Sequence, residues 1–361
     1  SRVARRASSS DDDDDDDEWT NDAFDATSLP PERRLRMNSL EDALRFLAPD
    51  ETARAYLDRA LAEPIASGIP WMDDDPEPAL RAGELIEIVG AGGSGKTELA
   101  IEIAARVVLP RRRDGTRYGG SEARVVVIDC DGKFDQLRVL RALNRNITDA
   151  LVGAKENARE RARDEVYEES MSRFTLVRAH SMVDVLKTLT ALDAAWAGEV
   201  EAAKTDGRFM DAVVTGTDGG DESGGGVGGG TTTVGMGSTQ RVVICDNVAA
   251  FYWLDRASRK DHGAPYNIQR VFTAAARLFK RLSNAHRAAV LVTKSTLAPH
   301  RGGEYKDFLP VEWSNAVTQR ILLTPSTETV GYGEYAGVAT WDAPAKRRGG
   351  TFTVTEERLR Y

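Results

Sequence analysis

Five short apolar runs, rich in valine and isoleucine, are spaced along the middle of the chain. They cover residues 85–89, 125–128, 174–177, 242–244 and 289–292. Nearly uninterrupted apolar runs of this length are typical of strands buried on both faces, whereas a strand with one solvated face alternates apolar and polar residues. The runs therefore predict a parallel β-sheet.

Between the runs, apolar residues recur every three or four positions, which is the spacing of one face of a helix. These segments cover residues 99–108, 134–143, 182–196 and 268–282. Strands that alternate with helices predict a doubly wound α/β fold. After Trp313 the pattern changes to strands at 317–324, 338–341 and 351–355, which predicts a small antiparallel edge closing the sheet.

Two tracts lack the apolar residues that a packed core requires. Residues 1–38 contain seven consecutive aspartates and few apolar residues, which predicts a disordered acidic tail. Residues 215–240 contain 11 glycines in 26 positions, and because the segments on both sides continue one pattern, we interpret this tract as a flexible surface insertion. We therefore expect one folded core over 39–361, with one or two short helices at 40–61 and a peripheral charged helix around 161–169.

The net charge of −9 comes almost entirely from the tail, since without the eight acidic residues at 11–18 the chain would carry −1. The nearly neutral body gives no independent indication of a nucleic-acid partner. No apolar stretch reaches the ~20 residues of a membrane span, and no secretory signal is visible. Cys130 and Cys245 each end an apolar run, as is typical of reduced intracellular proteins, so we expect the cytosol or the nucleus.

The strongest local motif lies between the first predicted strand and the first predicted helix. It consists of Gly90, Ala91, Gly92, Gly93, Ser94, Gly95, Lys96 and Thr97. This is the pattern of a phosphate-binding loop, in which glycines let the backbone N–H groups and the helix N-terminus approach phosphate closely. Lys96 is expected to reach the β- and γ-phosphates of a nucleotide, and the Thr97 hydroxyl to ligate Mg²⁺.

A nucleotide site of this kind needs a carboxylate at the end of a neighbouring strand. The apolar run 241–245 is followed by Asp246, which we predict to be the metal-side carboxylate. The run 124–128 is followed by Asp129 and Asp131, for which two interpretations stay open. Either one of them lies near the γ-phosphate and orients water, or both merely cap the helix that follows.

The residues around these carboxylates resemble those of a known family. The relevant runs are Val127-Ile128-Asp129-Cys130-Asp131-Gly132-Lys133-Phe134 and Asp246-Asn247-Val248-Ala249-Ala250-Phe251-Tyr252-Trp253-Leu254-Asp255-Arg256. They resemble the RecA-type recombinases and, within these, the eukaryotic recombinase paralogues, over roughly residues 49–323. The Phe251-Tyr252-Trp253 run is the most specific element.

The resemblance implies a RecA-like P-loop ATPase core that binds ATP and Mg²⁺ at an edge shared by neighbouring subunits. It implies these roles: Lys96 and Thr97 on phosphate and Mg²⁺, Asp246 on the metal, Asp131 on the attacking water, and Arg138 stacked on adenine. Two departures affect hydrolysis. Asp131 is one methylene shorter than the glutamate of the family, and Lys294-Ser295 replaces the Asn-Gln pair that senses the γ-phosphate. We therefore expect ATP binding to be more secure than ATP hydrolysis.

The resemblance also implies that single-stranded or branched DNA, if bound, contacts the segments 255–266 and 294–312. Their basic residues are Arg256, Arg259, Lys260, Lys294, His300, Arg301 and Lys306. The family's Phe-x-x-Ala joining segment is not found before Gly83, and the similar letters at 272–275 lie on the apolar face of a predicted helix. These features fit a terminal member of a hetero-oligomer of related paralogues.

The sequence thus favours an ATP-binding recombinase paralogue, located in the nucleus, that acts in homologous-recombination repair of double-strand breaks and assists the main recombinase. The cytoplasm is the alternative location. A second hypothesis is a structural subunit that does not hydrolyse ATP and only holds partner paralogues together. A small-molecule kinase is disfavoured, because no arginine-bearing lid or acceptor pocket is evident.

Overall fold

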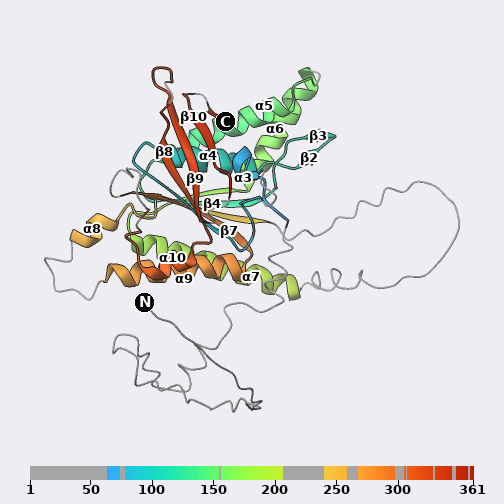
Figure 1. Ribbon diagram of the computed structural model, residues 1–361. Coiled ribbons are helices and arrows are strands. Elements are labelled where there is room, and N and C mark those ends of the chain that lie inside the picture. The colour runs from blue at the N-terminus through green and yellow to red at the C-terminus, as the bar shows by residue number, and fades with distance from the viewer. Residues whose placement is uncertain are drawn as a thin grey trace, which may run out of the picture. The chain divides into compact units, whose positions relative to one another are not determined.

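A single sheet of nine strands organises the computed structural model, in the order β11-β10-β9-β8-β1-β7-β6-β4-β5 (Figure 1). The strands are β1 (Leu85–Gly90), β4 (Arg124–Asp129), β5 (Phe174–Arg178), β6 (Arg241–Asp246), β7 (Ala288–Ser295), β8 (Gln319–Pro325), β9 (Tyr335–Ala343), β10 (Gly350–Val354) and β11 (Leu359–Arg360). A separate hairpin pairs β2 (Arg112–Arg113) with β3 (Thr116–Arg117). The six strands from β8 to β5 in this order pair in parallel, which confirms the predicted parallel sheet.

The structure describes residues 63–73, 78–153, 156–205, 240–257, 267–296, 305, 307–327, 330–343, 347–356 and 358–361. All of them belong to one compact unit within residues 51–361. The predicted tail at 1–38, the helices expected at 40–61 and the glycine-rich insertion except Gln240 lie outside these residues. No helix among the described residues is both long enough and apolar enough to cross a membrane.

Helices cover both faces of the sheet, as the alternating pattern predicts (Figure 1). They are α3 (Pro70–Asp73), α4 (Lys96–Val107), α5 (Gln136–Ala150), α6 (Glu156–Ser172), α7 (Met182–Thr205), α8 (Tyr252–Ala257), α9 (Ile268–Ala285) and α10 (Val311–Ala316). One face carries α4, with α5 and α6 packed beside it, and the other carries α7, α9 and α10. The charged helix predicted around 161–169 is part of α6.

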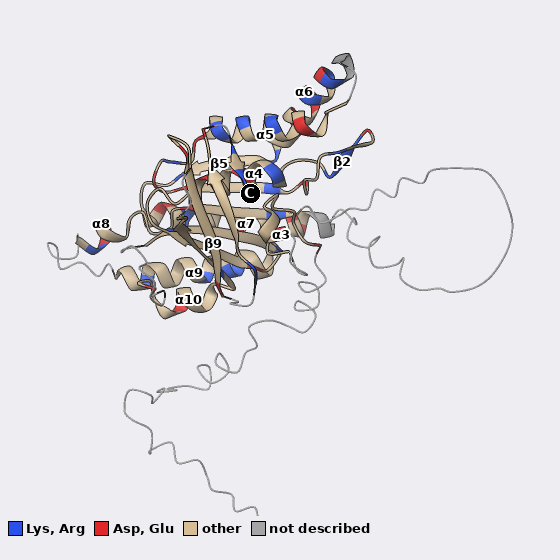
Figure 2. Ribbon diagram, turned by 45° about the horizontal axis from the view of Figure 1, so that its top comes forward, with Lys and Arg blue, Asp and Glu red and all other residues tan. Residues whose placement is uncertain are grey.

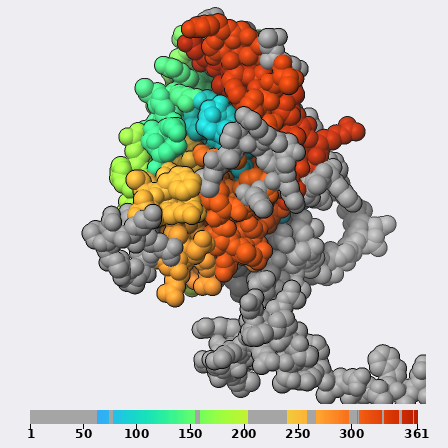
Figure 3. Space-filling model, turned by 60° about the vertical axis from the view of Figure 1, so that its left-hand side comes forward, coloured from blue at the N-terminus to red at the C-terminus, as the bar shows by residue number. Residues whose placement is uncertain are grey.

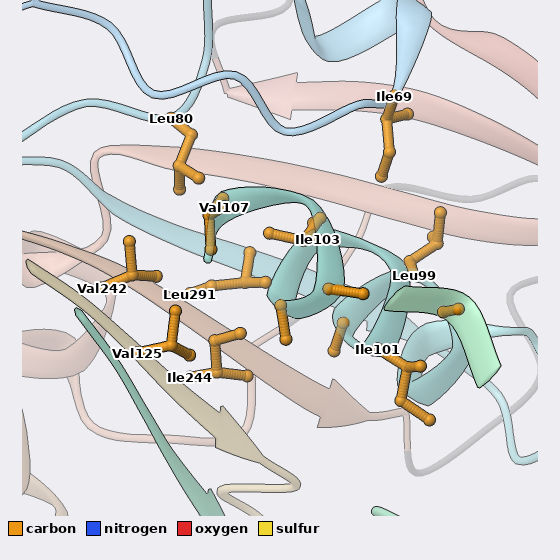
Figure 4. Packing of buried hydrophobic residues seen from close by; sticks show 14 of the residues in the cluster. Ile69, Leu80, Leu99, Ile101, Ile103, Val107, Val125, Val242, Ile244 and Leu291 are labelled. Carbon is orange, nitrogen blue, oxygen red and sulfur yellow. The ribbon is translucent and has the colours of Figure 1, made fainter. Parts of the chain in front are cut away.

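Side chains of the central strands alternate between two cores. In β6, Val242 and Ile244 belong to the core under α4, whereas Val243 and Cys245 belong to the core under α9. Figure 4 shows the first of these cores, in which residues of α4 pack above Val125, Val242, Ile244 and Leu291. Both faces of these strands are therefore buried, which explains why their sequences are almost uniformly apolar.

Two details of the prediction are wrong. The strand predicted at 317–324 belongs to the parallel part, because β8 pairs in parallel with β1 and only β9, β10 and β11 form the antiparallel edge. The helix α10 lies between β7 and β8, so the chain crosses the sheet and returns in the same direction. The strand β5 is not buried on both faces, because it is the edge strand and only Phe174 in it is buried.

Candidate nucleotide-binding site

The phosphate-binding loop joins the end of β1 to the start of α4, as predicted. Gly93 and Gly95 have φ values of +78° and +85°, a backbone conformation that glycine adopts without strain. A Cβ atom on Gly95 would also lie 2.8 Å from the ring of Phe352 in β10. Glycine is therefore required at position 95 both by the backbone and by the close approach of the C-terminal edge strands.

Lys96 is the first residue of α4, and its ammonium group lies inside the loop. Its Nζ donates hydrogen bonds to the carbonyl oxygens of Gly90 (3.0 Å) and Ala91 (2.7 Å), and to Ser94 Oγ (3.3 Å). The residue is only 7% exposed. Burial lowers the pKa of Lys96 to about 8, although the nearby Asp246 carboxylate acts in the opposite direction. The loop thus holds a desolvated cation at the N-terminus of a helix.

Asp246 ends β6 and faces the start of α4. Thr97 Oγ1 donates a hydrogen bond of 2.8 Å to Asp246 Oδ2, although the two residues are 149 positions apart in the sequence. The hydroxyl of Thr293 on β7 donates to the other carboxylate oxygen. Burial raises the pKa of Asp246, and the two hydroxyl donors counteract that rise. Lys96, Thr97 and Asp246 are therefore brought together, as the sequence predicts.

Asp129 is the last residue of β4 and pairs with Asp246 on the neighbouring strand, and Asp131 lies on the turn that follows. Neither caps the next helix, because Asp135 is the N-cap of α5 and accepts a hydrogen bond from the N–H of Leu137 (2.9 Å). Asp129 is buried and accepts from the N–H of Gly132, whereas Asp131 lines the pocket beside the loop. The capping interpretation is thus wrong, and Asp131 lies where a carboxylate could face a bound phosphate.

The pocket around the loop has a volume of about 360 Å³. It is lined by Gly92, Gly93, Ser94, Gly95, Lys96, Thr97, Glu98, Asp131, Lys133, Arg138, Asp246, Asn247, Ser295, Tyr335 and Val354. Figure 3 shows this side of the molecule, with the start of α4 (cyan) between the region of α5 (green) and the C-terminal strands (red). The volume is within the range of small-molecule sites.

Arg138, on the first turn of α5, reaches the same pocket and forms an ion pair with Glu98 of α4. Glu98, Lys133, Asn247, Tyr335 and Val354 were not identified as site residues from the sequence. For Tyr335 and Val354 no sequence signal exists, because nothing in the chain order shows that β9 and β10 lie beside the loop. Lys133 and Asn247 could have been found as the polar residues that follow the two strand-end carboxylates.

The residues present fit a magnesium-bound nucleotide. The first N–H groups of a helix have no intrahelical partner and attract phosphate, and Lys96 adds a positive charge at this point. No group of three or more His, Cys, Asp or Glu in the described ranges is arranged to hold a metal by itself. Mg²⁺ does not need such a cage, because it is commonly bound by one or two protein groups together with phosphates and water. Thr97 and Asp246 could supply that pair.

Lys294 and Ser295 end β7, and the structure separates their environments. Asn247 Nδ2 donates to Ser295 Oγ (2.9 Å), and the N–H of Ser295 donates to Asn247 Oδ1 (3.2 Å), at the edge of the pocket. Lys294 is fully buried, with its Nζ 2.6 Å from Glu87 Oε1 and 2.9 Å from Asp307 Oδ2. The expectation that Lys294 contacts DNA is therefore wrong, because its charge is neutralised inside the protein.

The two predicted DNA segments lie partly outside the described residues, which end at 257 and 296 and resume at 267, 305 and 307. Their described parts are not simple loops, because 255–257 belong to α8, 294–295 to β7 and 311–312 to α10. Figure 2 shows Lys and Arg on several elements, including α5, α6 and α9, and not gathered on one side. Arg256 stacks over the Trp253 ring on α8, at 5.5 Å from its centroid.

Comparison with known proteins supports the same kind of site. A family model described as "AAA domain" matches residues 73–295. The chain is 24% identical over 336 residues to the DNA repair protein XRCC2 homolog of Arabidopsis thaliana, covering 80% of each chain. It is 24% identical to the DNA repair protein RAD51 homolog 4 of Bos taurus (80% of this chain, 70% of the relative) and 20% identical to the DNA repair protein XRCC2 of Mus musculus (68% and 74%). The expected resemblance to the recombinase paralogues is confirmed.

Proposed function

The chain belongs to the AAA domain family and is similar to XRCC2 and RAD51-type repair proteins, and from this premise we propose that it is an ATP-binding recombinase paralogue. Its role would be in homologous-recombination repair of DNA double-strand breaks, in the nucleus. It would act within a complex of related paralogues that assists the main recombinase. The curated relatives carry the repair role in their names, and the site described above supports the nucleotide.

The hydrogen bond between Thr97 and Asp246 is the observation that carries the ATP proposal. It brings a hydroxyl and a carboxylate suited to Mg²⁺ next to the Lys96 ammonium, from the helix α4 and the strand β6, which are far apart in sequence. Mg²⁺ bound with ATP would neutralise part of the phosphate charge. Lys96 would exchange its carbonyl partners for phosphate oxygens, and Asp246 would hold the metal with Thr97.

Arg138, Tyr335 and Val354 lie at the side of the pocket formed by α5 and the C-terminal strands. A purine ring could stack on the Arg138 guanidinium, as the family resemblance implies, and contact the largely apolar side chains of the other two. Asp131 would orient water near the terminal phosphate. These roles follow from the position of the residues around one pocket.

A second function, that of a structural subunit that does not hydrolyse ATP and only holds partner paralogues together, is favoured by two contacts. Asp131 is engaged in an ion pair with Lys133, with the Nζ atom 2.9 Å from Oδ2. Ser295 is hydrogen-bonded to Asn247 and is too short to extend further toward a phosphate. Both groups that would support hydrolysis are thus occupied by neighbouring residues.

Equilibrium binding tests the nucleotide proposal. We expect the wild-type chain to bind ATP with Mg²⁺, Lys96→Met to lose this binding, and Asp246→Asn to lose its dependence on Mg²⁺. Lys187→Met is a matched control, because Lys187 is an exposed lysine of α7 that does not line the pocket. Wild-type binding no stronger than that of Lys96→Met would show that the pocket is not an ATP site.

A repair assay in cells that lack the protein separates the two functions. If ATP binding is required, Lys96→Met fails to restore recombination after double-strand breaks, although related paralogues still co-purify with it. If Lys96→Met restores repair fully and keeps its partners, the scaffold function is favoured. Absence of recombinase relatives from the co-purifying proteins would contradict both.

A further inference from the structure

Lys133 lies on the turn that follows β4, and none of the roles above uses it. Gly132 precedes it with a φ of +72°, and the N–H of Gly132 donates to the buried carboxylate of Asp129 at 2.9 Å. This contact fixes the backbone of the turn next to the pocket. The Lys133 side chain, in contrast, is 71% exposed and forms an ion pair with Asp131, so the ammonium group can change partner without disturbing the core.

The charge of Lys133 acts directly on the pocket. It is one of the causes that lower the pKa of Lys96, and its own pKa is raised by the hydrogen bond to Asp131 and by the charges of Asp246 and Asp129. Lys133 is therefore a protonated, pocket-lining cation at neutral pH. Its ion pair with Asp131 is exposed on the lysine side, and such pairs contribute little to stability. Exchanging this pair for a stronger one costs the protein little.

The other cations near the pocket are engaged elsewhere. Arg138 forms an ion pair with Glu98, and Lys294 is buried with Glu87 and Asp307 on the far side of β7. The end of β7 thus offers only the short Ser295, which Asn247 already binds. Among the cations of the described residues that line the pocket, Lys133 is the one with a largely exposed side chain. A third phosphate would add negative charge to this pocket.

Building on the proposed ATP binding, we propose that Lys133 binds the terminal phosphate of a nucleoside triphosphate, exchanging Asp131 for it, and so makes the site prefer triphosphate over diphosphate. A terminal phosphate carries more negative charge than the single Asp131 carboxylate. A hydrogen bond between an ammonium group and a phosphate is also of the strong, charge-assisted kind. The same exchange releases the Asp131 carboxylate. Lys133 would thus contact the terminal phosphate in place of a longer polar side chain at the end of β7, where this chain has the short Ser295.

Binding of ADP and of a non-hydrolysable ATP analogue, both with Mg²⁺, tests this proposal in the full chain. We expect Lys133→Met to weaken binding of the analogue about tenfold and to change ADP binding less than twofold. Lys133→Arg should retain the preference, because it keeps the charge. Lys187→Met should leave both affinities unchanged, and because Lys133 is exposed, its variants should unfold at the wild-type temperature.

An Asp131→Asn background separates direct contact from simple neutralisation of Asp131. If Lys133 binds the phosphate, Lys133→Met still weakens analogue binding about tenfold when Asp131 is already uncharged. If the effect of Lys133→Met disappears in that background, or if the single variant keeps the wild-type preference, the proposal is overturned while ATP binding stands. Wild-type protein that binds neither nucleotide would overturn both.

Discussion

Replacing Lys96 by methionine should make the free energy of unfolding less dependent on pH. Lys96 is only 7% exposed, and its pKa in the folded chain is about 8, against about 10.4 in an unfolded chain. The two carbonyls it contacts keep another donor without it, because Gly90 O accepts from the N–H of Thr296 (3.0 Å) and Ala91 O from that of Ser94 (3.2 Å). The variant therefore leaves no orphaned carbonyl in the loop.

The magnitude follows from the difference in pKa. Between pH 8 and about pH 10.4 the unfolded chain keeps the Lys96 proton and the folded chain loses it, so raising the pH favours folding across this window. Below pH 8 the cost of the buried charge is fully present, and at about 1.36 kcal/mol per pKa unit it amounts to about 3 kcal/mol. Methionine carries no such cost at any pH. The hydrogen bonds that the variant loses change the stability difference between the two proteins by nearly the same amount at every pH.

Urea denaturation of both proteins at several pH values between 7 and 10 measures this difference. Over this range the stability of Lys96→Met relative to wild type should fall by about 2.5 kcal/mol, while the effects of other titrating groups cancel because both proteins share them. A stability difference that stays constant within about 0.5 kcal/mol would show that Lys96 is not desolvated in the folded chain. The loop would then be open to water and the proposed pocket incorrectly described.

Two further substitutions test the packing around the site. Lys294→Met leaves the buried Glu87 carboxylate without its ammonium partner at 2.6 Å, and should lower the free energy of unfolding in urea by about 3–5 kcal/mol. Adding Glu87→Gln should restore a large part of the lost stability. If the double variant is no more stable than Lys294→Met alone, the ion pair is refuted. Gly95→Ala should cost about 1–3 kcal/mol because of the φ of +85° and the contact with Phe352, and should weaken ATP binding. The control Gly92→Ala, where a Cβ meets nothing within 4 Å, should be nearly neutral, and equal effects at the two positions would contradict the loop geometry.

The core of the fold could be predicted because local pattern and tertiary position agree there. Strands β4, β6 and β7 are buried on both faces, so their sequences are apolar except at their ends, and α9 repeats its apolar residues with helical spacing. The direction of β8 could not be read in this way. An apolar strand pattern looks the same whether the neighbouring strand is parallel or antiparallel, and α10, which decides it, has only six residues.

The residues of the site also fall into some that the sequence predicts and others that it does not. Lys96, Thr97 and Asp246 could be predicted because each lies at the end of a regular element, where a parallel sheet brings such ends together. Lys133, Tyr335 and Val354 could not, since their place in the pocket depends on turns and on edge strands whose position only the folded chain defines. Lys294 was misassigned for a related reason. A lysine after an apolar run is usually exposed, and only the buried Glu87 on β1 and Asp307 explain why this one is not.

Glu87 also bears on the proposal that ATP binding is more secure than hydrolysis. It interrupts the apolar run of β1, and its carboxylate contacts Lys294, Arg320 and the indole N–H of Trp313, which ties β7, β8 and α10 together below the pocket. The strand β1, which leads into the phosphate-binding loop, is thus held to its neighbours by buried contacts. Asp131, the residue that would serve hydrolysis, lies on the turn after β4 and depends on an exposed lysine partner. A change that weakened hydrolysis could therefore occur at Asp131 without disturbing the binding of a nucleotide.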